Sequence, residues 1–295
     1  MEQDNLRGSL LMVFAMATFA LEDMFLKLSA LELPLGQILF ASGAFGVLVF
    51  ALMAAREGRS VLVRDALHPA LLWRNAGEMA GSYAYILALS TMPLPTVSAV
   101  LQAMPLAVTL GAALFLGEGV GWRRWTAILA GFGGVVLVIR PGIAGFDASA
   151  LWVLVTVVCL AVRDLASRRV PATCSNAQVS CWGMASVGLL GAAMLLAGEP
   201  AIWPEVPQLL YLCGVLVFGS LGYWGITAAT RVGEVSVVSP FRYMRLLFAI
   251  VIGALVFAEW PDGLTLAGAG IIIGAGLYSF LRERARALSM RASWR

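Results

Sequence analysis

Two arginines, Arg242 and Arg245, stand three residues apart within a long apolar stretch of the chain. This spacing puts both side chains on one face of a helix. A guanidinium group binds a carboxylate or a phosphate through two parallel hydrogen bonds. The pair therefore predicts either a binding site for an anionic group or a structural ion pair with acidic side chains of neighbouring helices.

Four acidic side chains also lie inside apolar stretches, namely Glu22, Asp23, Glu78 and Asp164. A carboxylate that is removed from water takes up a proton or pairs with a cation. Glu22 and Asp23 are adjacent, so their side chains point about 100° apart around a helix. One of them could line a cavity as a solute or proton site, while the other pairs with an arginine.

Arginines accompany the other two carboxylates. Glu78 stands four residues after Arg74, which predicts an ion pair on one helix face, with solute binding as the alternative role of Glu78. Arg163 directly precedes Asp164. We expect Arg163 either to extend to the cytoplasmic surface or, together with Asp164, to form part of a gate or a helix interface.

Aromatic and small side chains occur in the same apolar stretches. Tyr83, Trp224 and Tyr243 are expected either to pack within a helix bundle or to line a solute cavity. Gly270 and Gly274 are four residues apart in the last apolar stretch, a spacing that lets membrane helices pack closely.

The chain has few of the residues that catalysis or metal binding requires. Its one histidine, His68, stands beside Pro69, and its four cysteines have no metal-ligand spacing. We therefore expect no catalytic residues, no metal and no cofactor. An intramembrane enzyme built on Asp23 and Asp164 is a remote alternative.

The amino-acid composition indicates whether these residues belong to a soluble or a membrane protein. Of the 295 residues, 60% are hydrophobic and 13% are charged, and the mean hydropathy is +0.88. Soluble domains average about 45–50% apolar and about 25% charged residues. The composition excludes a cytosolic enzyme, a disordered protein and a nucleic-acid binder. It indicates an all-α integral membrane protein whose partner is the lipid bilayer.

A bilayer-spanning helix needs about 20 mostly apolar residues. Ten such stretches are expected, at Gly8–Ala30, Pro34–Ala54, Ala70–Ser90, Pro95–Leu116, Trp122–Ile139, Ser149–Arg169, Ser175–Ala197, Val206–Ala229, Val235–Phe257 and Gly263–Leu281. With the N-terminus in the cytoplasm, fourteen arginines lie on the cytoplasmic side, against Lys27 and Arg140 on the other. Because positive side chains concentrate in cytoplasmic loops, we expect a multi-pass protein of the inner or plasma membrane with both termini cytoplasmic.

The two halves of the chain resemble each other. Rare polar residues align when the chain is shifted by 141 positions, so that Asp23 meets Asp164, Gln37 meets Gln178 and Glu118 meets Glu259. The offset equals five spans, and an odd number of spans places the two copies in opposite orientations. Inverted repeats of this kind are typical of secondary transporters, whose solute sites lie near the membrane midplane.

Several segments carry a resemblance to a known family. The first half contains Pro105, Leu114-Phe-Leu-Gly-Glu118 and Gly131-Phe-Gly-Gly134, and the second contains Phe241-Arg-Tyr-Met-Arg245 and Phe257-Ala-Glu259. These segments resemble the EamA half-repeat of the drug/metabolite transporter superfamily. The resemblance implies ten helices as two inverted five-helix repeats, at 1–140 and 149–281, followed by a basic tail at 282–295. Leu246 stands where the first half has Pro105, so the helix kinks need not be symmetric.

The expected function is that of a secondary transporter, acting as a monomer on a small organic solute, with protons as a candidate coupling ion. The arginine pair favours a carboxylate-bearing solute such as an amino acid, whose amine would meet Glu22, Asp23 or Glu78. By analogy with YddG-type amino-acid exporters of the superfamily, export is favoured. Uptake of a vitamin or a nucleoside-like solute, such as riboflavin or S-adenosylmethionine, is the alternative.

Overall fold

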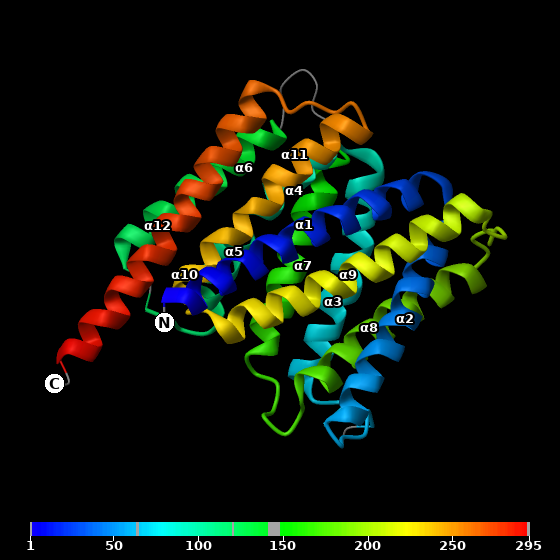
Figure 1. The fold of residues 1–295 in the computed structure, drawn as a ribbon, viewed down its shortest axis with the longest axis horizontal. Coiled ribbons are helices and arrows are strands. Elements are labelled where there is room, and N and C mark those ends of the chain that lie inside the picture. Colours follow the sequence, from blue (N-terminus) through cyan, green and yellow to red (C-terminus); the bar gives the residue numbers. More distant parts are fainter. Residues whose placement is uncertain (1, 63–64, 120, 141–147, 294–295) are drawn as a thin grey trace. The chain divides into compact units, whose positions relative to one another are not determined.

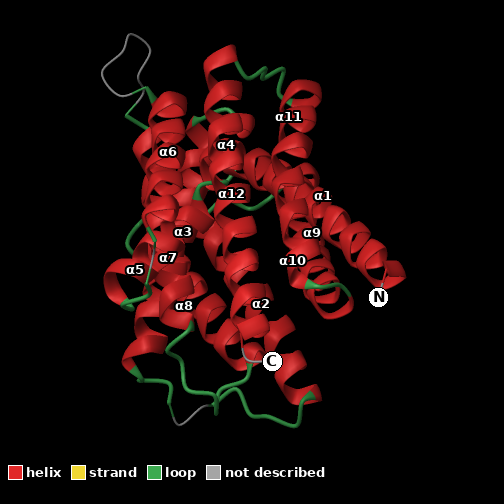
Figure 2. Ribbon diagram, turned by 90° about the vertical axis from the view of Figure 1, so that its left-hand side faces the viewer, coloured by secondary structure: helices red, strands yellow, loops and turns green. Residues whose placement is uncertain are grey.

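The computed structural model describes residues 2–62, 65–119, 121–140 and 148–293. Throughout these residues the chain is helical, with short connections and no strand (Figure 2). Residues 141–147, where the two halves are expected to join, lie outside the described residues, as do Arg64 and the last two residues of the basic tail.

Each expected span corresponds to one helix or to a broken helix. The first five are α1 (Glu2–Glu32), α2 (Leu35–Arg56), α3 (Pro69–Thr91), α4 (Leu94–Leu101) followed by α5 (Met104–Phe115), and α6 (Trp122–Ile139). The other five are α7 (Ala150–Ser167), α8 (Asn176–Leu196), α9 (Val206–Val232), α10 (Val235–Val238) followed by the 3-10 helix η1 (Ser239–Tyr243) and α11 (Met244–Val256), and α12 (Gly263–Ser293). The helix α12 therefore continues through most of the expected tail.

Within the described residues, nine helical segments are long and apolar enough to cross a membrane. The tenth expected span, α3, has 23 residues but is more polar, because it carries Arg74, Asn75 and Glu78. All three of these side chains are buried within the protein. The polar side chains of α3 therefore face other helices, where they can be satisfied, and this arrangement suits a membrane protein.

The repeat that the sequence predicts is visible in the helix bounds. Equivalent helices begin or end 141 residues apart, as at Leu35 and Asn176, Trp122 and Gly263, and Phe115 and Val256. The two halves of the chain therefore form the same succession of helices, which confirms the expected all-α fold of two repeats.

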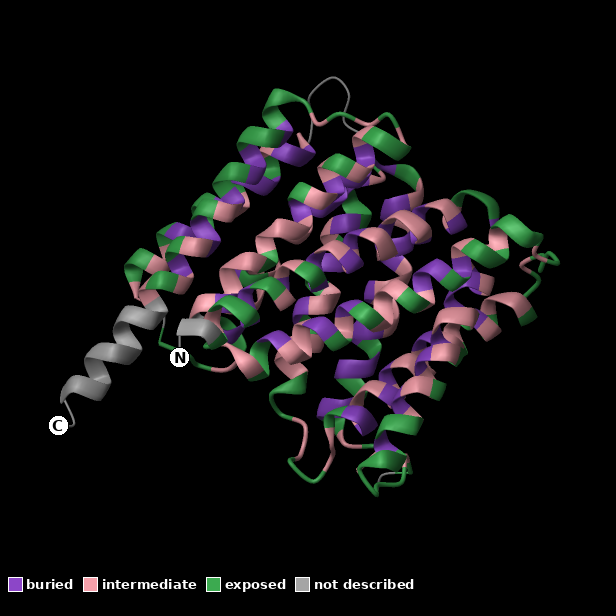
Figure 3. Ribbon diagram, viewed as in Figure 1, coloured by how far each residue is buried: buried purple, intermediate pink, exposed green. Residues whose placement is uncertain are grey.

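The helices gather into two compact units, each of which contains helices from both repeats. The first unit comprises residues 1–24, 93–148 and 218–295, and the second comprises residues 25–92 and 149–217. Within the first unit α6 lies along α12, and within the second α2 lies along α8 and α3 along α7 (Figure 1). Buried and exposed residues alternate along α6 and α12, as expected for helices with one packed face (Figure 3).

Glycine lets α6 and α12 approach closely. A Cβ atom added at Gly134 would lie 2.8 Å from the carbonyl oxygen of Gly268, so neither position has room for a side chain. The prediction that Gly270 and Gly274 serve this purpose was wrong, because a Cβ atom at either would meet nothing within 4 Å. The spacing of small residues indicates close packing but not which side of the helix packs.

The fourth and ninth spans are both interrupted, and at equivalent positions. The first break, between α4 and α5, falls at Gln102 and Ala103, and the second is the 3-10 turn of η1, which ends at Tyr243. The Gln102 amide donates a hydrogen bond of 3.2 Å to the carbonyl oxygen of Tyr243, its own repeat equivalent. The breaks are therefore symmetric although the prolines are not, because the second half has Pro240 in η1 in place of a proline at Leu246.

The same backbone turn ends both broken helices. Gly117 adopts a φ of 69° and its equivalent Ala258 a φ of 55°, and the next residue in each case donates its N–H to a carbonyl six residues earlier. A left-handed conformation costs a residue with a Cβ atom about 1–2 kcal/mol. Ala258 therefore carries a backbone strain that Gly117 avoids.

We expect Ala258→Gly to raise the free energy of unfolding by about 0.5–1 kcal/mol, since the relief of strain exceeds the added entropy of the unfolded chain. Gly117→Ala should lower it by a similar amount, because nothing lies within 4 Å of the added Cβ atom and only the backbone strain remains. Thermal melting of the purified variants in detergent measures both. Shifts of the same sign would contradict this account.

Candidate functional site

The candidate residues fall into two groups, one in each compact unit. In the first unit, Arg245 at the start of α11 makes a bidentate ion pair with Asp23 of α1. Its Nε lies 2.9 Å from Asp23 Oδ2, and its Nη2 lies 2.6 Å from Asp23 Oδ1. The Asp23 side chain is 1% exposed, and the Arg245 guanidinium also lies over the ring of Phe19. Of the two roles predicted for Arg245, the structural ion pair is therefore the one that its contacts match.

The other charged candidates of the first unit have different surroundings. Arg242 lies in η1 and is exposed, unlike the half-buried Arg245. Glu22 points at α9, where a Cβ atom added at Gly219 would lie 2.6 Å from Glu22 Oε1. The hydroxyl of Tyr243 occupies the space that a side chain at Gly276 of α12 would fill. Whether these groups contact a solute stays a prediction.

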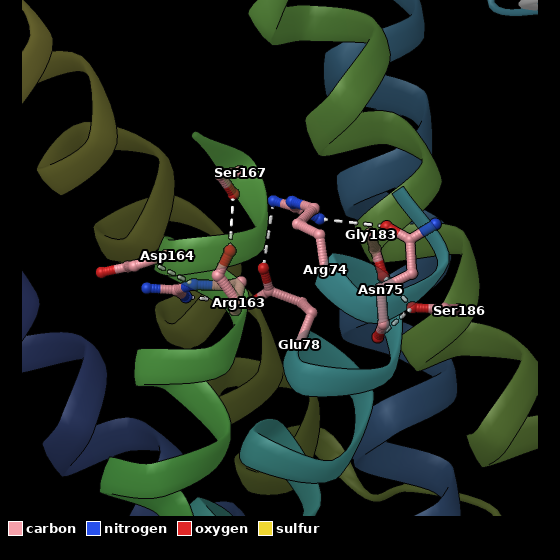
Figure 4. Close-up of polar contacts among 8 residues, drawn as sticks. All are labelled: Arg74, Asn75, Glu78, Arg163, Asp164, Ser167, Gly183 and Ser186. Atoms are coloured by element: carbon pink, nitrogen blue, oxygen red, sulfur yellow. Dashed lines mark hydrogen bonds and ion pairs between the residues drawn. The ribbon is translucent and has the colours of Figure 1, made fainter. Parts of the chain in front are cut away.

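In the second unit, Glu78 of α3 binds two arginines (Figure 4). Its Oε2 lies 3.1 Å from Arg74 Nη2, which confirms the ion pair expected on that helix face, and its Oε1 lies 3.2 Å from Arg163 Nη1 of α7. Arg163 Nε also donates to Asp164 Oδ1 over 2.9 Å. The four side chains alternate in charge, and the expected helix-interface role of Arg163 describes its contacts better than extension to the surface.

Glycines make room for this network. A Cβ atom at Gly183 of α8 would overlap the Arg74 guanidinium, and one at Gly77 of α3 would lie 2.9 Å from the backbone nitrogen of Arg163. The network therefore joins α3 to α7 and presses against α8, with Ser186 of α8 donating to the carbonyl oxygen of Asn75 (Figure 4). The charges alternate across the interface of α3 and α7, with Arg74 and Glu78 buried and Arg163 and Asp164 half-buried.

The two aromatic candidates at equivalent repeat positions differ in exposure. Tyr83 is half-buried and meets Trp152 edge to face, with 6.0 Å between ring centroids. Trp224 is 58% exposed and meets the partly exposed Phe14 edge to face at 6.4 Å. Equivalent positions thus have unlike surroundings, and cavity lining stays a prediction for both.

Polar contacts of Lys27 and Glu259 hold helix ends in place. Lys27 Nζ donates over 2.7 Å to the carbonyl oxygen of Met92, which follows the last turn of α3. Glu259 Oε2 accepts a hydrogen bond of 2.8 Å from the N–H of Leu94 at the start of α4. A cation at a helix C-terminus and an anion at an N-terminus both oppose the helix dipole favourably. The sequence signal for both contacts is a single charged residue in or beside an apolar stretch.

Arg140 and Asp262 form an ion pair outside the membrane-spanning segments. Asp262 also accepts a hydrogen bond from the N–H of Thr265 in the first turn of α12. The hydrogen bond from Arg140, followed by that from Thr265, holds the pKa of Asp262 well below its usual range. A carboxylate with a depressed pKa in the folded state contributes stability above its unfolded pKa and loses it as the pH falls.

We expect Asp262→Asn to lower the melting temperature at neutral pH, because it weakens the pair with Arg140 and the start of α12. The difference from the unsubstituted protein should shrink as the pH falls below about 4, where the unfolded carboxyl becomes protonated, and vanish below the depressed folded pKa. Melting curves of both proteins across this range measure it. A difference that is independent of pH would contradict an ionised Asp262.

A comparison with protein families decides the identity of the fold. The model of the EamA-like transporter family matches residues 6–140 and again residues 148–281. The chain belongs to the EamA-like transporter family. It is therefore a multi-pass membrane transporter of the drug/metabolite transporter superfamily, and not an enzyme. Among the described residues no group of three or more His, Cys, Asp or Glu side chains could hold a metal ion.

Relatives of this chain are named for different solutes. A riboflavin transporter of Rhizobium johnstonii is 25% identical over 95% of this chain and 92% of its own. An S-adenosylmethionine uptake transporter of Rickettsia felis is 24% identical over 69% of each chain. The pseudopaline exporter CntI of Pseudomonas aeruginosa is 29% identical over 91% of this chain and 94% of its own. The relatives thus share small-metabolite transport.

The fold also resembles a solved one. A crystal structure of a protein of 20% sequence identity superposes on 98% of this EamA-like chain and 99% of its own, with a TM-score of 0.60.

Proposed function

We propose that this EamA-family protein is a secondary transporter for small zwitterionic metabolites that carry an amino-acid group, free amino acids included. It would work by alternating access. The main support is the interruption of the fourth and ninth spans at equivalent positions in the first unit. In secondary transporters, membrane helices that are broken at corresponding places in the two halves form the solute site.

Arg242 is the residue that we assign to the carboxylate of the solute. It lies in the broken segment η1 and is exposed. Both oxygens of Asp23 are bonded to the guanidinium group of Arg245. A guanidinium group suits a carboxylate because two of its N–H groups match the two oxygens. We therefore assign a solute-binding role to Arg242 and a structural role to Arg245.

Counterflow in proteoliposomes tests the substrate class. Vesicles loaded with one unlabelled solute are given a trace of the same labelled solute, with amino acids, S-adenosylmethionine and riboflavin compared in turn. We expect exchange of solutes with an amino-acid group, which S-adenosylmethionine has and riboflavin lacks. Exchange of riboflavin alone would contradict the proposal. It would favour the second candidate, a vitamin carrier that relies on aromatic surface, for which the riboflavin-transporting relative argues.

Export is the favoured direction, as in the pseudopaline exporter among the relatives. Cells that express the protein and are loaded with the exchanged solute should lose it faster than cells without the protein. Concentrative uptake into the same cells would contradict export and leave the substrate class intact.

We also propose that both termini are cytoplasmic, because arginines then concentrate on the cytoplasmic side. In a variant whose four cysteines are serine, a cysteine in place of the exposed Ala201 should react with a membrane-impermeant maleimide from outside intact cells. A cysteine in place of the exposed Arg123 should react only after the membrane is opened. The reverse pattern would invert the topology.

A further inference from the structure

The same helix contact occurs once in each compact unit, with different side chains. In the second unit α7 packs on α3, and in the first unit the equivalent helices, α1 and α9, are in contact. The offset of 141 makes Glu22 the equivalent of Arg163 and Gly219 the equivalent of Glu78. The two contacts can therefore be compared position by position.

In the second unit this contact is an ion pair. Arg163 Nη1 of α7 lies 3.2 Å from Glu78 Oε1 of α3, so the charge at one position is matched by the side chain at the other. In the first unit a charge is present but its partner side chain is absent. The Glu22 carboxylate of α1 faces Gly219 of α9, where only a hydrogen atom replaces the side chain.

Two neighbouring charges of opposite sign act on Glu22. The charged groups that act on it are Asp23 on its own helix and Arg245 on α11, while α9 presents the uncharged Gly219. Both oxygens of Asp23 are bonded to Arg245. The three side chains together carry one negative charge, and among the described residues Glu22 makes no hydrogen bond or ion pair of its own.

A carboxylate within a membrane span is costly unless a positive charge accompanies it. We propose that Glu22, opposite Gly219, binds a single positive charge during transport, supplied either by a proton or by the ammonium group of the solute. The Glu22 carboxylate itself occupies the space that a side chain at Gly219 would take, so no protein charge stands there in the place of Glu78. If the positive charge is the ammonium group of the solute, the inference rests on the proposed function. If the positive charge is a proton, the inference is independent of the proposed function.

A divalent metal ion fits the same place poorly. Calcium ions take six to eight oxygen ligands, and magnesium ions demand octahedral geometry. The described residues contain no group of three or more carboxylate, histidine or cysteine side chains that could supply them. The single carboxylate of Glu22 suits a monovalent cation better than a divalent one.

Infrared spectroscopy tests the proton source without any solute. Difference spectra of the purified protein between alkaline and acidic pH should contain the band of a carboxyl group that becomes protonated within the membrane, and Glu22→Gln should remove it. Glu32→Gln, a matched change at the exposed end of α1, should leave the band in place.

Solute binding tests the ammonium source. Affinities for an amino acid and for its deaminated analogue are measured by thermal shift on the same preparations. If the ammonium group occupies the site, Glu22→Gln should weaken binding of the amino acid about ten- to hundredfold and leave the deaminated analogue unchanged. Glu32→Gln should change neither affinity.

A double variant keeps the proposal testable if the single variant Glu22→Gln does not fold. The double variant Glu22→Arg with Gly219→Glu copies the pair of Arg163 and Glu78 into the first unit. It should melt within a few degrees of the unsubstituted protein, yet lose the protonation band and at least tenfold in amino-acid affinity.

The results of these measurements are interpreted as follows. Loss of the infrared band in Glu22→Gln supports the proton source, and selective loss of amino-acid affinity supports the ammonium source. A Glu22→Gln protein that keeps both the band and the affinity overturns the proposal, as does a folded double variant that keeps both. If the unsubstituted protein binds no zwitterionic solute, the proposed function fails, while the infrared comparison still decides whether Glu22 is a proton site.

Discussion

Glu78→Gln should lower the free energy of unfolding by about 3–5 kcal/mol, the usual cost of removing one partner from a buried ion pair. Glu78 is the only acidic side chain that binds both Arg74 and Arg163 in the described part of the chain, and its side chain is 9% exposed. Without its charge, two guanidinium groups would remain side by side among α3, α7 and α8. Thermal melting in detergent measures the effect.

Two further variants show whether this loss comes from uncompensated charge. Glu57→Gln, at the exposed end of α2, makes the same chemical change and should leave the melting temperature almost unchanged. Adding Arg163→Gln to Glu78→Gln removes one of the two neighbouring guanidinium charges and should restore part of the lost stability. A Glu78→Gln protein that melts like the unsubstituted one would mean that the network contributes little to the fold.

Arg242→Lys should weaken solute binding about ten- to hundredfold while the melting temperature stays the same. Arg245→Lys should instead lower the melting temperature and leave the solute affinity of the folded protein unchanged. A lysine keeps the charge but loses the bidentate fork, and one charge-assisted hydrogen bond is worth about 1.5–3 kcal/mol. At position 242 that loss falls on the solute in our proposal. At position 245 it falls on Asp23, which is buried and bonded through both oxygens.

Affinity and melting temperature are measured on the same purified proteins, so that a misfolded fraction is not mistaken for weak binding. Arg123→Lys, on the exposed surface of α6, is the matched control and should change neither quantity. If Arg242→Lys binds the solute normally, Arg242 is not the anion site, and the assignment of an amino-acid group to the solute loses its main support.

The positions of the helices could be predicted from the sequence because they depend on local properties. A membrane helix satisfies its own backbone, so a run of about 20 apolar residues is enough to specify it. The span expected at Trp122–Ile139 is α6 to the residue. The repeat could be predicted for a similar reason, since the offset of 141 is a property of the chain that folding preserves.

The partners of the charged side chains were decided by the tertiary structure. Arg74 and Glu78 could be paired from the sequence because one helix turn fixes their distance. Asp23 and Arg245 stand 222 residues apart, and Arg242 offered the same charge at the same depth. Which arginine meets Asp23 depends on how α1 packs against α11, a contact between distant segments that no local pattern encodes.

The same distinction separates the repeat from its chemistry. The sequence alone determined that Glu22 and Arg163, and likewise Gly219 and Glu78, are equivalent positions. Only the tertiary structure brought each of these positions against the other across a helix interface, once as an ion pair and once as a carboxylate facing a glycine. The physical reason is that a charge is costly or useful in a membrane according to what packs against it, and packing joins residues that the chain keeps far apart.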